Sequence, residues 1–393
     1  VGFNSMLANT SGGNNVAIGR DSLNDNTTAS NNVGVGHNSL SKNTTGAQNV
    51  AVGANALDAN TSANDNTAVG YNAAGGTTTG ADNVAIGTNS LLLNTTGDAN
   101  VAVGRSALTA NTTADNNTAV GRSSLTANTT GSDNTAVGKA AGTAVTTAIK
   151  NTLIGAIAGD ALNTGSFNVA VGMQALSADT KGAKNVAIGQ GALEAQNFTS
   201  ATDSYNTAVG HFAGGSITTG AGNTFVGGLA GDANTTATNN TAVGLNALGA
   251  NTTGAANTAL GRNALLANTT ASDNTAVGVN AMDTNTTGAS NVAVGQSALN
   301  ANTTADSNTA VGYHSLLSNT TGASNTFMGA LTGDALTTGD FNVIVGSQSD
   351  STAVDSDKAQ GFGFNLACEA GFTTIGSGSD DIRAAHGNVT WAT

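Results

Sequence analysis

The chain carries 24 aspartate and glutamate residues, and these are the side chains most able to act on a substrate. A glycosidase needs two carboxyl groups about 5 to 10 Å apart, one to donate a proton and the other to activate water or attack the sugar. Here the acidic residues occur singly along the sequence, and their spacing picks out no pair. We therefore predict no catalytic residues and no enzymatic activity.

Metal binding is the second chemistry that the sequence could support. The histidines are scattered, with no His-x-His pair to gather a metal, and solvated imidazoles are expected. They are His37, His211, His314 and His386. Three aspartates recur in a Gly-Asp-Ala context, namely Asp160, Asp232 and Asp334. Carboxylates of this kind can bind Ca²⁺, but capping of a local turn is the simpler interpretation. We predict no metal site and no cofactor.

A short stretch, Asn15-Val16-Ala17-Ile18-Gly19, recurs with small changes along almost the whole chain. Its glycine occupies 21 positions from Gly2 to Gly346, which gives 20 intervals. Nineteen intervals are 17 residues long, and one, from Gly189 to Gly210, is 21. A fixed period of this kind is typical of stacked units that contact mainly their neighbours. We therefore predict an all-β fold, a parallel β-solenoid or β-roll of 17-residue coils.

The repeat divides the 393-residue chain into two expected regions. Residues 1–346 form the solenoid shaft of 20 coils, with a four-residue insertion between 189 and 210, and residues 347–393 form a small β-rich tip or cap. The chain has no proline, which agrees with a continuous ladder because proline would remove a ladder bond. Disorder is the alternative for a chain with so few aromatic residues, but disorder requires no fixed register. The single cysteine, Cys368, excludes an intrachain disulfide.

Within one coil, the run (Val/Thr)-Ala-(Val/Ile) before the glycine predicts a strand that ends in a tight turn. A second strand is expected over Ala-Leu-x-Ala-Asn-Thr-Thr. The asparagine four residues before the glycine occurs in every complete copy. We predict an interior ladder in which these amides bond from coil to coil. Its first members are Asn15, Asn32, Asn49, Asn66, Asn83 and Asn100.

The alanine two residues before the glycine and the leucine four residues after it are expected to share one space. In three coils the leucine is replaced by Gly159, Gly231 or Gly333, and the alanine by Leu153, Phe225 or Phe327. The same coils gain Ile157, Leu229 and Leu331 two residues after the repeat glycine. We expect these three side chains to restore the remaining volume, because protein interiors are close-packed.

Receptor contacts are expected where the coil faces solvent. The position directly after the repeat glycine varies freely and predicts an exposed ridge, whose candidate binding residues are Arg20, His37, Tyr71 and Tyr313. The insertion around residues 197–205 predicts a surface loop and adds Phe198 and Tyr205. Trp391 is the candidate in the C-terminal region.

The predicted strand is apolar on both faces, so both faces should be covered. We expect identical chains to associate laterally, as a homotrimer around an axis parallel to the stack. Eleven basic against 24 acidic residues give a charge of −13, which argues against a nucleic-acid partner. No apolar run reaches transmembrane length, so no direct membrane insertion is expected. Threonine ladders can bind ice, but adjacent threonines on a strand point to opposite faces and leave one outward threonine per coil.

The strand motif, for example Asn83-Val84-Ala85-Ile86-Gly87, resembles the head repeat of trimeric autotransporter adhesins, whose unit is shorter than 17 residues. That resemblance implies a left-handed parallel β-roll assembled as a trimer. The first residues, Val1-Gly2, match the end of the strand motif, so we expect further sequence before Val1.

The C-terminal segments 361–365, 380–383 and 386–393 are similar to the region before the self-cleaving intramolecular chaperone of phage tail fibres and tailspikes. In that family the chaperone templates the trimer and then removes itself. Together the resemblances imply an extracellular fibre on a virion tail that presents a binding surface to a host cell-surface glycan or protein. A bacterial surface adhesin head or extracellular filament is the alternative.

Overall fold

The structure is a computed structural model that describes residues 1–387. Within this range it contains 27 strands and no helix. The chain divides into two compact units, Val1–Ser204 and Tyr205–Thr393. In both, three-residue strands pair in parallel at a spacing of 17 residues, as in the pairs Ala68↔Ala85 and Ala242↔Ala259. The predicted all-β parallel solenoid is confirmed.

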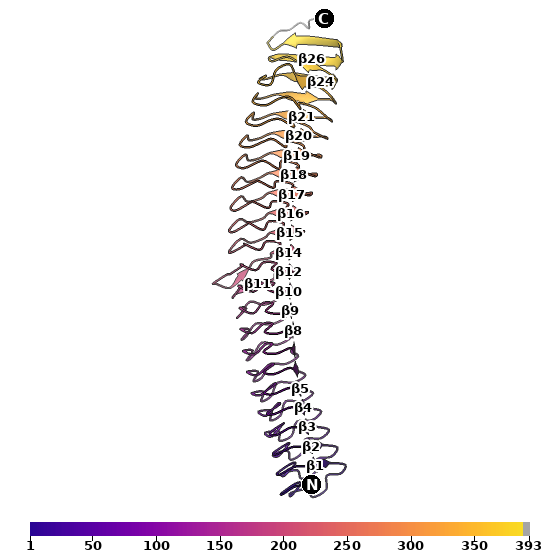
Figure 1. Ribbon diagram of the computed structural model, residues 1–393, viewed down its shortest axis with the longest axis vertical. Coiled ribbons are helices and arrows are strands. Elements are labelled where there is room, and N and C mark those ends of the chain that lie inside the picture. Colours follow the sequence, from indigo (N-terminus) through magenta and orange to yellow (C-terminus); the bar gives the residue numbers. More distant parts are fainter. Residues whose placement is uncertain (388–393) are drawn as a thin grey trace. The chain divides into compact units, whose positions relative to one another are not determined.

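In the first unit, the three-residue strands form one parallel sheet and lie one above another (Figure 1). They are β1 (Val16–Ile18), β2 (Val33–Val35), β3 (Val50–Val52), β4 (Thr67–Val69), β5 (Val84–Ile86), β6 (Val101–Val103), β7 (Thr118–Val120), β8 (Thr135–Val137), β9 (Thr152–Ile154), β10 (Val169–Val171) and β12 (Val186–Ile188). A separate parallel pair, β11 (Gly182–Ala183) and β13 (Thr202–Asp203), carries the insertion.

The second unit repeats this arrangement with nine three-residue strands. They are β14 (Thr207–Val209), β15 (Thr224–Val226), β16 (Thr241–Val243), β17 (Thr258–Leu260), β18 (Thr275–Val277), β19 (Val292–Val294), β20 (Thr309–Val311), β21 (Thr326–Met328) and β22 (Val343–Val345). Five further strands follow, namely β23 (Asp350–Ser351), β24 (Gln360–Phe364), β25 (Ala367–Cys368), β26 (Phe372–Ser377) and β27 (Asp380–Ala385).

The stack extends further than the sequence period suggested. Although the period was expected to stop at Gly346, β24 pairs with β22 in parallel one full period later, with Gly361 opposite Ile344. The β23–β25 pair keeps the same 17-residue offset, with Ala367 opposite Asp350. β26 then joins β24 in parallel and β27 pairs with it in the antiparallel direction. One more coil therefore precedes the β26–β27 hairpin.

Each coil turns at the glycine that closes its strand, and no other residue fits there. Gly36 has a φ of 138° and Gly53 one of 137°, a region that side chains rarely adopt. A Cβ on Gly36 would collide with the carbonyl oxygen of Gly53 in the next coil. The recurring glycine thus sets both the turn and the close approach of successive coils.

The prediction of a second strand in each coil is wrong. The segment after the corner has alternating left-handed residues such as Asn38 (φ 56°) and Leu40 (φ 51°), and it forms turns. It still bonds to both neighbouring coils, because the N–H of Asn38 donates to the Arg20 carbonyl and that of Leu40 to the Ala56 carbonyl, each at 3.0 Å. A left-handed leucine costs about 1–2 kcal/mol, and full burial of its side chain offsets this by about 1.5–3 kcal/mol.

The adjacent threonines of the repeat differ in exposure, with Thr44 half-buried and Thr45 exposed. The Thr44 hydroxyl donates to the Thr61 carbonyl of the next coil at 2.9 Å. The segment is not a strand, so the two threonines do not alternate across a sheet, but one threonine per coil is still the more exposed.

Asparagine side chains connect the coils from inside. The backbone N–H of Asn49 donates to Oδ1 of Asn32 at 2.9 Å, and Nδ2 of Asn32 donates to the Gly46 carbonyl at 2.9 Å. Five of the six named members are buried, and Asn15 at the beginning of the chain is half-buried. The buried members are Asn32, Asn49, Asn66, Asn83 and Asn100.

A second asparagine ladder, which the sequence analysis missed, lies seven residues after the corner glycine. Nδ2 of Asn43 donates to Oδ1 of Asn26 at 3.1 Å and to the Gly46 carbonyl at 2.9 Å. Two buried amides therefore converge on one carbonyl. The recurring asparagine of Asn-Thr-Thr was the signal for this ladder.

The predicted exchange of volume between the alanine and leucine positions is confirmed. A Cβ on Gly231 would lie 2.6 Å from Cζ of Phe225, and one on Gly159 would lie 2.8 Å from Cδ2 of Leu153. Gly142 and Gly214 also occupy the left-handed leucine position, but their coils keep Ala136 and Ala208 at the alanine position.

The expected role of Ile157, Leu229 and Leu331 is wrong, because all three are only partly buried. Five coils have glycine at the leucine position. In four of them, an apolar residue at the second asparagine position fills the space that the leucine side chain would occupy. These apolar residues, all fully buried, are Val145, Leu162, Ile217 and Leu336.

We predict that Phe225→Ala leaves a cavity and lowers the free energy of unfolding by about 3–5 kcal/mol at full burial. Adding Gly231→Leu should recover part of this loss, because Leu248 adopts the same geometry in the next coil, with a φ of 56° against 57°. Leu229 needs no change, since it lies outside the pocket.

Thermal unfolding of the three variants tests this prediction. Gly231→Leu alone should destabilise the protein, because its side chain meets the Phe225 ring. A double variant that melts no higher than Phe225→Ala would contradict a shared pocket.

Candidate functional site

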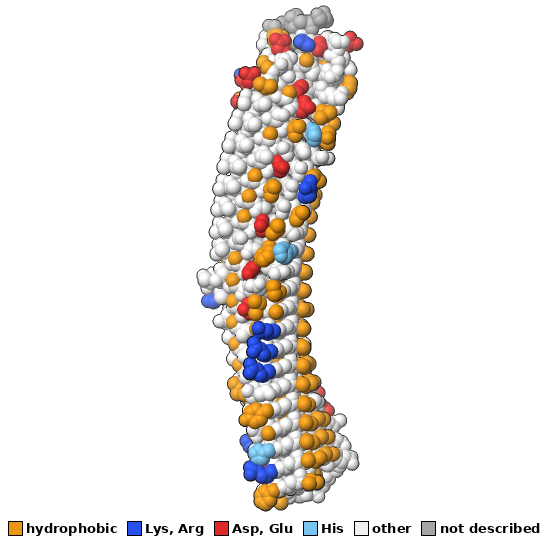
Figure 2. All heavy atoms as spheres, in the orientation of Figure 1, with side chains coloured by type: hydrophobic (Ala, Val, Ile, Leu, Met, Phe, Trp, Pro, Cys, Tyr) orange, Lys and Arg blue, Asp and Glu red, His pale blue; other side chains and the backbone are white. Residues whose placement is uncertain are grey.

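The sheet of each unit has an inner and an outer face with different roles. In β5 the central Ala85 is fully buried in the coil, whereas Ile86 points outward and is 39% exposed. The pattern recurs in the second unit, where Ala259 is buried and Leu260 is exposed. Because the strands pair in register, the outward residues form a continuous apolar row within each unit, and Figure 2 shows such rows in orange.

The row does not end with the three-residue strands. Strand pairing places Phe362 opposite Val345, Ile375 opposite Phe362, and Ile382 opposite Ile375. These side chains are exposed as well. The side chains at the C-terminal end of the row are thus larger than the valines that precede them.

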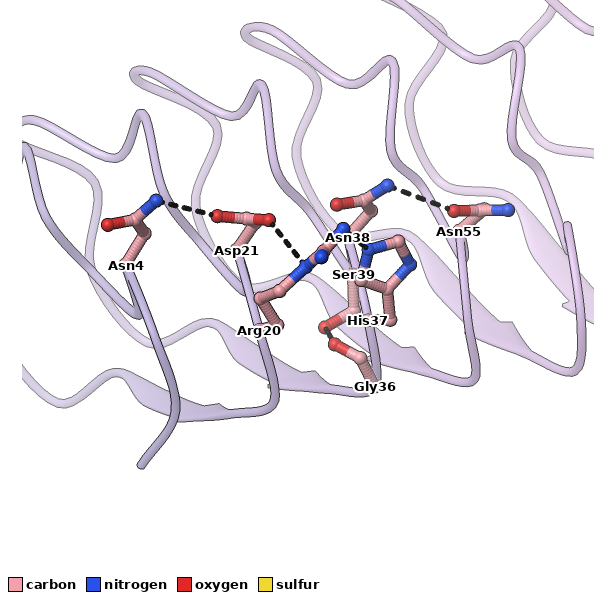
Figure 3. Close-up of polar contacts among 8 residues, drawn as sticks. All are labelled: Asn4, Arg20, Asp21, Gly36, His37, Asn38, Ser39 and Asn55. Atoms are coloured by element: carbon pink, nitrogen blue, oxygen red, sulfur yellow. Dashed lines mark hydrogen bonds and ion pairs between the residues drawn. The ribbon is translucent and has the colours of Figure 1, made fainter.

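The exposed ridge lies beside this row. Arg20 forms an ion pair with Asp21, with Nε and Oδ2 3.1 Å apart, and its Nη2 lies 2.7 Å from Nε2 of His37 (Figure 3). Tyr71 is exposed. Tyr313 is exposed and stacks on the His314 ring, with the centroids 3.9 Å apart. These four candidates share one position in the coil, but only Arg20 and His37 contact each other, and Tyr71 and Tyr313 each lie in a separate coil.

The insertion is anchored by a buried aspartate that replaces an asparagine of the second ladder. Oδ1 of Asp179 accepts the N–H groups of Gly182 at 3.0 Å and Phe198 at 3.1 Å, and its Oδ2 accepts from Nε2 of Gln196 at 2.7 Å. Phe198 is only 7% exposed and so offers little surface to a receptor. Tyr205, by contrast, is 58% exposed.

A shallow groove of about 470 Å³ lies beside the insertion. Its lining combines hydroxyl groups, two lysines, one carboxylate and one aromatic ring, and consists of Thr164, Ser166, Phe167, Lys181, Ala183, Lys184, Ala201, Thr202 and Asp203. The Phe167 ring is 47% exposed and Nζ of Lys150 lies 5.7 Å from its centroid. Lys184 and Asp203 form an ion pair at 2.6 Å. An accessible ring beside hydrogen-bonding groups is suited to a sugar or a peptide.

Sequence reasoning missed this groove. Its residues come from three segments that the coil stacking brings together, and their spacing in the sequence does not indicate that they meet. The signal that was present is Phe167, an aromatic residue at a position that is usually small or polar in other coils.

The aspartates that could act as acids lie apart. Burial raises the pKa of Asp160 and of Asp232, with backbone hydrogen bonds opposing part of that rise. Among residues 1–387 no three His, Cys, Asp or Glu side chains gather in a way that could hold a metal ion. The Gly-Asp-Ala aspartates therefore belong to no such group of three within the described residues.

Asp334 lies close enough to the Asp350 carboxyl group to affect its pKa. Burial raises the pKa of Asp350 to about 6, and the neighbouring Asp334 adds to the rise, although the N–H groups of Ala335 and Ser351 oppose it. Burial also raises the pKa of the Cys368 thiol to about 11, with the Asp350 charge contributing. This cysteine is buried and stays protonated at neutral pH.

No protein-family model matches the chain, and no curated protein matches it. In the part of the chain that the structure describes, no helix has the length and apolarity needed to span a bilayer. Trp391 lies outside the described residues.

We predict that protonation of Asp350 makes the last coils more stable in mild acid than at neutral pH. A carboxyl group whose pKa rises on folding binds its proton more tightly in the folded state, so stability falls as the pH rises from 3.8 to about 6. Allowing for partial exposure, the loss is on the order of 1 kcal/mol. Asp350→Asn should abolish this dependence and stabilise residues 350–368 at pH 7.

Amide hydrogen exchange of residues 350–368, corrected for intrinsic rates at pH 5 and pH 7, measures this local effect. Asp380→Asn, which alters an exposed carboxylate of the same region, is the matched control. Equal protection of the unmodified protein at both pH values would contradict the prediction.

Proposed function

We propose that the chain is a structural and adhesive fibre protein that works as an assembly of identical copies, most simply a homotrimer. The observation that carries this proposal is the continuous outward apolar row. A monomeric soluble protein rarely exposes a contiguous apolar surface of more than a few hundred Å², and a larger one usually marks an interface. Parallel sheets are also normally covered on both faces.

The chemistry of the coil explains why a second copy suits this face. The inner face is filled by the alanine and leucine positions of the same coil, so nothing within a coil covers the outer face. The spacing between successive outward residues is the same from coil to coil, because each coil adds one strand in register. A partner with the same spacing can contact the row coil by coil, and another copy of the chain has that spacing.

The adhesive part of the proposal depends on the groove beside the insertion and on the exposed ridge. Phe167 offers a ring face, and the neighbouring Lys184–Asp203 pair and hydroxyl groups offer hydrogen bonds, a combination suited to a cell-surface glycan or protein. The C-terminal similarity to phage tail fibres favours an extracellular fibre on a virion tail. A bacterial adhesin of the same coil type is the alternative.

We expect native mass spectrometry to show a homotrimer at micromolar concentration. Ile86→Lys combined with Val103→Lys should weaken assembly at least tenfold, because each change places an unpaired charge in an apolar interface. Thr45→Lys with Thr96→Lys adds the same charge on exposed threonines away from the row and should have little effect. A wild-type chain that stays monomeric would contradict the proposed assembly.

We also expect Phe167→Ala to reduce binding to host cells about tenfold, since loss of one stacking ring in a sugar or peptide site removes about 1–2 kcal/mol. Phe341→Ala removes the equivalent exposed ring of the second unit and is the matched control. Binding is measured with the labelled, assembled protein on intact cells. Equal loss in both variants would contradict a specific role for the groove.

A further inference from the structure

Three successive coils of the first unit carry opposite charges at the two ends of the same strand. An aspartate lies two or three residues before β6, β7 and β8, and a cation lies two residues after each of them. The pairs are Asp98 and Arg105 around β6, Asp115 and Arg122 around β7, and Asp133 and Lys139 around β8. The outward apolar row runs between these two charged edges, and Figure 2 shows Lys and Arg side chains stacked beside it at the level of β8.

These charges are not neutralised by ion pairs within residues 1–387. Among the described residues none of the six forms an ion pair, and the three cations are exposed. The two members of a coil are six or seven residues apart, or at most roughly 24 Å of extended backbone, and the sheet face lies between them. Asp98 and Asp115 are fixed in place, since Oδ1 of Asp98 accepts from the Ala81 N–H at 2.7 Å and Oδ1 of Asp115 from the Asp98 N–H at 2.8 Å.

The arrangement distinguishes between the two ways in which copies can pack their apolar faces together. A rotation about an axis parallel to the stack keeps all copies pointing the same way and exchanges the two edges of the sheet. The aspartate edge of one copy then meets the cation edge of its neighbour at the same level. A copy turned end over end would instead place aspartates against aspartates and cations against cations.

We propose that the two charged edges of β6, β7 and β8 fix the polarity of assembly, so that copies associate in parallel through the apolar row. The proposal rests on the self-association proposed above and adds its direction. The partner is a second copy of the chain, because it alone carries both charged edges at the same spacing as the apolar row.

The interaction energies of the charged edges are of the size needed to select one orientation of the copies. A solvent-exposed ion pair contributes only about 0–1 kcal/mol, whereas like charges brought together across an interface are clearly unfavourable. The apolar row therefore supplies most of the affinity, and the charged edges discriminate against the inverted arrangement. Cyclic closure then sets the register, because identical copies displaced along the stack would form an open filament.

The test reverses one edge and then both. Arg105→Glu, Arg122→Glu and Lys139→Glu together leave two acidic edges, and the dissociation constant at low salt should rise about tenfold. Adding Asp98→Lys, Asp115→Lys and Asp133→Lys recreates opposite edges in reversed positions, which should restore the constant to within about twofold of the wild type. Sedimentation equilibrium measures both values.

A charge-matched control combines Lys42→Glu with Thr45→Glu, Thr96→Glu, Thr113→Glu and Thr130→Glu, which lowers the net charge by the same six units at exposed positions away from both edges. Orientation is read from energy transfer between fluorophores on Ser11→Cys in each copy, since Cys368 is buried. Transfer should be high in the wild type and in the six-residue variant, as expected for parallel copies.

Each outcome decides between named alternatives. If the wild type assembles but the three-glutamate variant behaves like the control, the polarity proposal fails while self-association stands. If the wild type is monomeric, both fail. If assembly is unchanged but binding of polygalacturonate, a linear polyanion, is lost in the three-glutamate variant, the cation edge is a ligand site instead.

Discussion

The close approach of successive corner glycines is the constraint on which the structure depends. At Gly36 the next coil's carbonyl occupies the place of a side chain, so the strands can pair in register only if every corner is glycine. Once the corners are fixed, backbone groups bond mainly to neighbouring coils. Buried amides such as Asn32 and Asn43 satisfy the carbonyls that remain inside the turn, where an unpaired group would be costly.

This constraint explains which parts of the fold the sequence could predict. The glycine and the asparagine before the strand are required at every turn, so their period indicated the solenoid and the buried amides. The Phe225–Gly231 exchange could be found because two positions change together. The second segment was wrongly predicted as a strand because its leucines adopt left-handed geometry, which sequence propensity does not anticipate and which burial stabilises.

The candidate site was less predictable than the fold for the same physical reason. Residues at the solvent face of a coil are under no packing constraint, so their types reveal exposure but not what they meet. Arg20 and His37 contact each other because the stacking places the same position of adjacent coils side by side. Phe198, chosen as a surface aromatic, is buried because Asp179 draws the insertion inward, and no pattern in the period indicated that contact.

Buried and exposed positions of the coil are therefore under different constraints. Inside, side chains are exchanged only in compensating pairs, as when Leu162 takes the place of an asparagine in a coil whose leucine position is glycine. Outside, the strand positions stay apolar or threonine while the flanking positions vary, so charge can be placed at either edge without disturbing a coil. A stack built in this way can change its outer residues without changing the residues that hold its shape. In the assembly and binding that we propose, changes at Arg105 or Phe167 would therefore alter recognition while the fold is retained.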